Sequence, residues 1–111
     1  MKRGDLVTMV VGGDYGKPRP ALVIQANAFA ELPSVTVLRL SGDVIPANLT
    51  RLAVGPSPEN GLRVMSQIMI DKAVSVPREK IGEAFGQLDD DTMKAVSRAL
   101  VAFLGLDGDA A

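Results

Sequence analysis

The sequence predicts an α+β domain in which short antiparallel strands form a partly open β-barrel and one helix follows at the C-terminus. Short apolar and β-branched runs alternate with glycine- and proline-rich turns along most of the chain. Clear helical periodicity occurs only near the C-terminus. The chain of 111 residues is long enough for one modest core, so we expect a single domain over residues 1–111.

Four strands are predicted in the first half of the chain. They span Leu6 to Val11, Pro20 to Gln25, Val35 to Leu40 and Leu49 to Val54. Residues 12–18 are rich in glycine and are typical of a hairpin loop between the first two strands. The second strand is apolar on both faces, which indicates a central position. The third alternates as far as Arg39 and ends at the turn sequence Ser41-Gly42-Asp43.

A long strand is predicted from Leu62 to Ile70, after the turn-forming residues 55–61. Its alternation places Val64, Ser66, Ile68 and Ile70 on one face. The segment from Ala73 to Val76 is expected to be extended, and residues 77–80 to form a short helical turn opened by proline. A last short strand is expected from Ala84 to Leu88.

One amphipathic helix is predicted at the C-terminus. Its start is marked by Asp89-Asp90-Asp91, which supplies N-cap candidates and negative charge for the positive end of the helix dipole. Gly105 is the predicted stop. An apolar stripe follows from spacings of three and four residues and consists of Met93, Val96, Leu100, Phe103 and Leu104.

The composition excludes several kinds of chemistry. The chain has no cysteine and no histidine, so disulfides, thiolate metal sites and histidine general bases are ruled out. The net charge of −1 argues against a long surface that tracks nucleic-acid phosphates, although a local basic site is compatible with it. No apolar run approaches the ~20 residues of a membrane span, and the N-terminus is a poor signal peptide. We therefore expect a cytoplasmic protein without a membrane partner.

The segment Gly16-Lys17-Pro18-Arg19-Pro20 places a guanidinium between two prolines at the start of an apolar strand. Because each proline fixes its own φ and restricts the residue before it, Arg19 has little backbone freedom. Arginine offers a planar fork of donors that matches two phosphate oxygens. Arg19 is therefore a candidate phosphate-binding residue, with a surface arginine packed on proline as the alternative.

Three blocks together resemble the MazF/PemK family of toxin–antitoxin endoribonucleases. They are Arg3-Gly4-Asp5, the segment from Arg19 to Gln25, and the segment from Thr36 to Ser41. Ile68-Met69-Ile70-Asp71 and the helix start from Leu88 to Met93 are similar as well. The resemblance implies a small SH3-like barrel and cleavage of single-stranded RNA without a metal or other cofactor. The implied products carry a 2′,3′-cyclic phosphate and a 5′-hydroxyl.

The same resemblance implies three catalytic residues, Arg19, Ser41 and Asp71. Arg19 takes the central role, and Ser41 orients the scissile phosphate or donates a hydrogen bond to it. Asp71 serves as a base or orients Arg19. From the residues alone, Ser-Gly-Asp is ordinary turn chemistry and Asp71 is a loop carboxylate before Lys72.

Three further residues are expected to contact RNA. Lys17 and Tyr15, in the glycine-rich loop, are suited to a backbone phosphate and to stacking on a base, and the alternative is a solvated hinge loop. Arg39 lines an RNA groove or pairs with a carboxylate. Residues that could form a metal site at typical ligand spacing are not found in the sequence.

The implied partners are single-stranded RNA, a second copy of the chain and a cognate antitoxin, usually with a disordered acidic tail. The rival hypothesis is a CcdB-like gyrase poison on the same fold, because residues 63–67, 75–83 and 103–106 resemble CcdB segments. That family ends in a Trp-Gly-Ile tail, and this chain contains no tryptophan. A third alternative is an interaction module without catalysis, in which Arg19 is merely structural.

Overall fold

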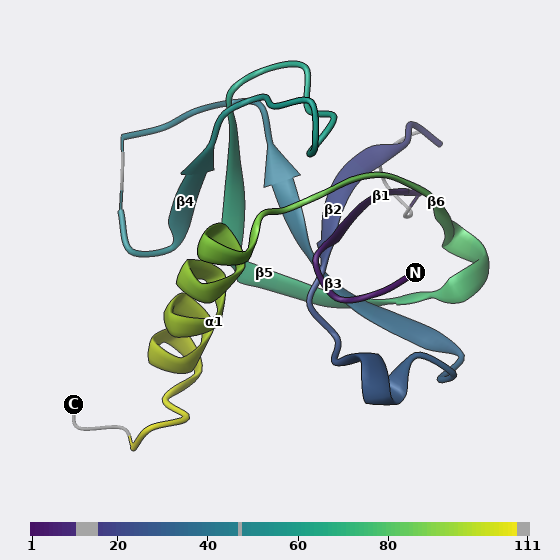
Figure 1. The fold of residues 1–111 in the computed structure, drawn as a ribbon. Helices are drawn as coiled ribbons and strands as arrows, with labels where there is room; N and C mark the ends of the chain where they lie inside the picture. The colour runs from purple at the N-terminus through teal and green to yellow at the C-terminus, as the bar shows by residue number, and fades with distance from the viewer. Residues whose placement is uncertain (11–15, 47, 109–111) are drawn as a thin grey trace.

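Six antiparallel strands pair in the order β4-β5-β3-β2-β1-β6 in the computed structural model, which describes residues 1–10, 16–46 and 48–108 (Figure 1). The strands are β1 (Asp5–Met9), β2 (Arg19–Val23), β3 (Ser34–Ser41), β4 (Arg51–Val54), β5 (Ser66–Pro77) and β6 (Ile81–Gln87). Two 3-10 turns, η1 (Asn27–Phe29) and η2 (Arg78–Lys80), and the helix α1 (Asp90–Leu104) complete the described elements. The predicted α+β class, a small SH3-like or partly open β-barrel of antiparallel strands with a C-terminal helix, is confirmed: the strands form one open antiparallel sheet that the helix follows.

The prediction for β5 was wrong in two respects. The strand begins at Ser66 rather than Leu62, because residues 63–65 are exposed and leave the sheet. It also continues without a break to Pro77, so the extended segment from Ala73 to Val76 belongs to the same strand. The reason is that β3 pairs with both halves of β5, from Ser34↔Pro77 to Ser41↔Gln67, across one irregularity.

The sheet has apolar residues on both faces. The face that packs on α1, called the helix face here, carries one cluster that includes Leu6, Leu22, Leu38 and Ile68 together with Val96 and Leu100 of the helix. The opposite face, called the second face, carries Val7, Met9, Ala21, Val23, Val35, Val37 and Val76. Because side chains alternate along a strand, odd-numbered residues of β1, β2 and β3 lie on the second face.

Helix α1 begins and ends where the sequence predicts. The Asp89 carboxylate accepts a hydrogen bond from the Thr92 N–H at 3.0 Å, and Gly105 ends the helix with φ of 67°. Figure 1 shows α1 lying beside β4 and β5. Among the residues that the structure describes, no helix is long and apolar enough to cross a membrane.

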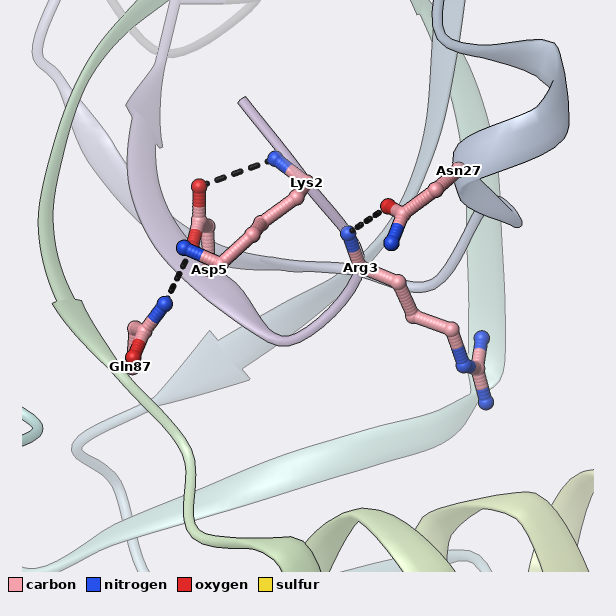
Figure 2. A network of polar contacts seen from close by, with 5 residues as sticks. All are labelled: Lys2, Arg3, Asp5, Asn27 and Gln87. Carbon is pink, nitrogen blue, oxygen red and sulfur yellow. Dashed lines mark hydrogen bonds and ion pairs between the residues drawn. The ribbon is translucent and has the colours of Figure 1, made fainter.

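The N-terminal block that contributed to the family resemblance has a structural role. The Asp5 carboxylate is buried and accepts hydrogen bonds from the Lys2 N–H at 2.9 Å and from the Gln87 side chain at 3.2 Å (Figure 2). Arg3 donates through its N–H to Asn27 at 2.7 Å and through its guanidinium to Ser97 of α1 at 2.8 Å. These contacts attach the chain start to β6, η1 and the helix.

Candidate active site

Arg19 and Ser41 lie on neighbouring strands at the same end of the sheet. β2 pairs with β3 through Ala21↔Arg39 and Leu22↔Leu38. Continuing this register by two residues places Arg19 across from Ser41. On its other side Arg19 pairs with Met9 of β1. The antiparallel register therefore brings together two candidate residues that were predicted separately from the sequence.

Both side chains belong to the second face. Arg19 alternates in β2 with Ala21 and Val23, and Ser41 alternates in β3 with Val37 and Val35. The apolar members of this face are buried, whereas Arg19 is exposed and Ser41 is half-buried. Arg19 and Ser41 therefore form a polar edge at the point where the buried apolar residues of this face end.

Ser41 retains a hydrogen-bond donor for a ligand. Its Oγ accepts a hydrogen bond from the Asp43 N–H at 3.1 Å, which fixes the turn that follows β3. A serine hydroxyl has one proton to donate and two lone pairs. The contact uses one lone pair and leaves the proton available to an oxygen of a substrate.

Arg39 and Asp71 line one pocket of about 330 Å³ on the second face. Its remaining walls are Met9, Lys72, Ala73 and Val74. The two residues meet because β3 and β5 pair irregularly between Leu38↔Ala73 and Leu40↔Ile68. Arg39 alone stands between these pairs on β3, whereas residues 69–72 stand between them on β5. The extra residues bulge out of the ladder and bring the Asp71 carboxyl to the level of Arg39.

The Asp71 carboxylate is held in its charged form. A hydrogen bond from the Lys72 ammonium, at 3.1 Å, lowers the pKa of Asp71, and the charges of Lys72 and Arg51 add to that effect against the opposing effect of desolvation. Its side chain is 27% exposed. Its buried Oδ1 has no hydrogen-bond partner within residues 1–10, 16–46 and 48–108. Asp71 therefore presents an ionised acceptor beside Arg39.

Two polar residues of the second face were missed by the sequence analysis as site residues. Gln67 pairs with Ser41 across β3 and β5 and is 3% exposed. Arg51 of β4 donates a hydrogen bond to Gln67 Oε1 at 3.4 Å. The alternation of the predicted strand placed Gln67 on the face opposite Ile68, and this was the signal in the sequence. The position of Gln67 beside Ser41 follows only from the strand pairing.

The glycine-rich loop is only partly described. Lys17 is exposed and lies two residues before Arg19, at the same end of the sheet. Tyr15 lies outside the described residues. The structure therefore places Lys17 near the polar edge and leaves the stacking prediction for Tyr15 as it stood.

Arginines from three strands, a serine hydroxyl and an ionised carboxylate share one end of the second face. This arrangement, on an antiparallel sheet with a C-terminal helix, defines a small α+β domain with a histidine-free, arginine-centred candidate site. Residues 2–104 match the family described as PemK-like, MazF-like toxin of type II toxin–antitoxin systems, and the chain belongs to that family.

Relatives and solved structures agree with this family. The chain is 41% identical to a probable endoribonuclease MazF of Mycolicibacterium smegmatis over 97% of this chain and 100% of that protein. It is 28% identical to endoribonuclease EndoA of Bacillus subtilis over 96% of each. A mycobacterial endoribonuclease solved in complex with its cognate antitoxin has the same fold, with a TM-score of 0.80 at 24% identity over 96% of each chain. The predicted toxin family is confirmed, and these matches favour the endoribonuclease hypothesis over the gyrase hypothesis.

Proposed function

We propose that this chain, as a single toxin domain over residues 1–111, is a metal-independent and sequence-selective endoribonuclease that cleaves single-stranded RNA. The observation that carries the proposal is the position of Arg19 across from Ser41 on the second face. Family membership and the names of the two curated relatives support the reaction class.

The proposed reaction is an internal transfer at phosphorus. The 2′-hydroxyl of the RNA loses its proton and its oxygen forms a bond to the phosphorus, while the bond to the 5′-oxygen breaks and that oxygen takes up a proton. The products are a 2′,3′-cyclic phosphate and a 5′-hydroxyl. Negative charge builds up on the non-bridging oxygens in the transition state. Donors fixed in advance around such oxygens stabilise the transition state more than the substrate. Arg19 supplies two parallel N–H donors, and the Ser41 hydroxyl supplies a third donor.

The proposed role of Asp71 is to orient the arginines rather than to accept the 2′-hydroxyl proton. An efficient general base has a pKa near the working pH. The hydrogen bond from Lys72 moves the pKa of Asp71 in the opposite direction, below its ordinary value of 3.8. An ionised carboxylate beside Arg39 instead limits the conformations of neighbouring guanidinium groups. Arg39 and Lys17 are the proposed contacts to flanking phosphates, and Tyr15 is the proposed stacking residue.

A second copy of the chain and an antitoxin are the proposed protein partners. An apolar groove of about 740 Å³ opens at the same end of the sheet as the site, where Pro18 and Pro20 meet Leu62, Val64 and Phe85. Val64, which lines this groove, is 58% exposed, and Phe103 of α1 is 51% exposed. These surfaces support a homodimer, and the solved complex of a relative with its antitoxin supports inhibition by such a partner.

We place the protein in the cytoplasm.

Incubation of the purified chain with a single-stranded RNA in EDTA tests the proposal. The expected result is a small set of fragments with 5′-hydroxyl ends, which polynucleotide kinase labels directly, and with cyclic phosphates at the 3′ side. The same protein is assayed against gyrase-dependent supercoiling. Intact RNA in this assay, at protein concentrations where the homodimer is verified by sedimentation, contradicts the proposal. Gyrase inhibition in its place would establish the rival function, and inactivity in both assays would favour the interaction module.

A further inference from the structure

Gln67 is a buried amide that binds the backbone of one loop residue through both ends of its side chain. It is 3% exposed and lies near the start of β5, where it pairs with Ser41 of β3 on one side and with Ala53 of β4 on the other. The Gln67 side-chain N–H donates to the Ile45 carbonyl at 2.8 Å. The Ile45 N–H donates to Gln67 Oε1 at 3.2 Å. Ile45 is therefore held to the sheet by a two-point contact of the kind one strand makes with another.

This contact fixes the segment that leaves the candidate site. Gln67 lies directly across from Ser41, and residues 42–45 run from Ser41 to Ile45, the residue that Gln67 holds. The near end of the segment is fixed by the hydrogen bond from the Asp43 N–H to Ser41 Oγ. The far end is fixed at Ile45. Ser41 thus begins a short loop that is attached to the sheet at two points, the Ser41 side chain at one end and the Gln67 side chain at the other.

Within residues 1–10, 16–46 and 48–108, the one further hydrogen bond to residues 42–46 runs from the Asn48 side chain to the Pro46 carbonyl, at 3.5 Å. Residues 42–46 are all exposed, and Ile45 itself is 41% exposed. Backbone groups of exposed residues exchange a lost protein contact for water at small cost in stability. Removal of the Gln67 amide would therefore free the loop without unfolding the sheet, because the strand pairs around it remain.

We propose that Gln67 is a positioning residue for the reaction: it holds Ile45 and thereby keeps the Ser41 hydroxyl aligned with Arg19. This inference rests on the proposed ribonuclease function. Small displacements of a catalytic group lower the rate of the chemical step strongly while they alter binding little. Arg51, which donates to the same Oε1 at 3.4 Å, orients the Gln67 amide.

Gln67→Met is the decisive variant, because methionine fills a similar volume and removes both hydrogen bonds. We expect kcat for RNA cleavage to fall about tenfold with KM changed by less than about twofold. Amide exchange at Ile45 should become at least about tenfold faster, while the amides of β3 and β5 keep their protection. The two readouts together separate alignment of the site from general destabilisation.

The chain offers a matched control at the other end of the sheet. Gln25 makes the same kind of two-ended contact: its side-chain N–H donates to the Phe29 carbonyl at 2.8 Å, and its Oε1 accepts from the Thr36 N–H at 3.0 Å. Gln25→Met removes that contact near η1, far from Arg19 and Ser41 along β2 and β3. Exchange at Thr36 should accelerate, and kcat should remain within about twofold of the original value.

A second-site change distinguishes positioning from direct contact of Gln67 with RNA. A Cβ added at Gly42 lies 3.6 Å from the Val64 side chain, an ordinary contact, so Gly42→Ala fits and reduces the freedom of the loop. In the Gln67→Met background, Gly42→Ala should restore kcat about threefold. A change confined to KM, or to the cleaved sequence, with no rescue would overturn the proposal in favour of direct contact.

Two other outcomes are equally clear. Unchanged kcat in Gln67→Met, with an original protein that cleaves RNA and depends on Arg19, overturns the positioning role alone. An original protein that leaves RNA intact in EDTA refutes the proposed function. In that case the inference fails with it, even if exchange at Ile45 responds as expected.

Discussion

Arg39 and Asp71 line the same pocket although the strands that carry them do not pair regularly at that level. A regular ladder would place one β5 residue across from Arg39, and the bulge places residues 69–72 there instead. The acidic group is therefore carried into a face that is otherwise basic at this end, with Arg19, Arg39 and Arg51 on three strands. The arrangement places the Asp71 carboxylate beside Arg39 at this basic end of the face.

Arg19→Ala should abolish most RNA cleavage. Loss of one well-placed electrostatic contact to the transition state costs ~10²–10³ in kcat. Arg19→Lys should recover little of it, because an ammonium keeps the charge and loses the two parallel donors. Single-turnover cleavage of a labelled RNA measures both. Arg98→Ala, which removes an exposed arginine from α1, is the control and should cleave normally. Cleavage that survives in Arg19→Ala would remove Arg19 from the active site.

Ser41→Ala should lower kcat by about tenfold, the usual effect of losing a hydrogen bond worth about 1.4 kcal/mol in the transition state. Ser41→Thr should retain activity, because the hydroxyl remains and the branched Cβ restricts its rotamers. The ratio of the two rates measures the contribution of the hydroxyl, which includes the turn that it stabilises through Asp43. If alanine and threonine gave equal rates, the hydroxyl would have no part in the reaction.

Much of this site could be predicted from sequence because it depends on strand ends. Prolines and glycines mark where β2 begins and β3 stops, and two strands in sequence that pair as neighbours then bring Arg19 to Ser41. Gln67 could not be assigned in this way. Its role depends on a pairing with Ser41 that crosses an irregularity, and on a backbone contact to Ile45 that no side-chain pattern encodes. The bulge that moves Asp71 is equally invisible in the local sequence.

Lys72→Ala should raise the pKa of Asp71 toward its ordinary value of 3.8, because the hydrogen bond from the Lys72 ammonium is the largest influence that lowers it. A carboxyl with a lowered pKa stays ionised until the pH falls below that value. RNA cleavage by the original protein should therefore show no inflection from Asp71 between neutral pH and about pH 4. NMR titration of the Asp71 carboxyl carbon, with the pH–rate profile alongside, measures both.

Asp71→Asn is the companion variant. We expect kcat to fall about tenfold at every pH above 4, because the orienting charge is lost and no proton acceptor near neutrality is removed. A profile in which the asparagine variant loses an inflection near neutral pH would show that Asp71 is the general base, and would overturn the orienting role. Asp107→Asn, which removes a carboxyl from the exposed C-terminal segment, controls for net charge.

Asp5→Asn should destabilise the fold at neutral pH and make it less sensitive to acid. Burial raises the pKa of Asp5, but the hydrogen bonds from the Lys2 N–H and Gln87 and the charge of Lys2 together lower it below 3.8. A carboxyl whose folded pKa lies below its unfolded value contributes stability above the unfolded value, and this is lost as the pH falls through the folded one. The expected loss is about 1 kcal/mol at pH 7, measured by urea unfolding. It should disappear as the pH falls through the folded pKa of Asp5, because both proteins then carry a neutral side chain at this position. A deficit that persists unchanged at pH 2 would place the effect in packing rather than in charge.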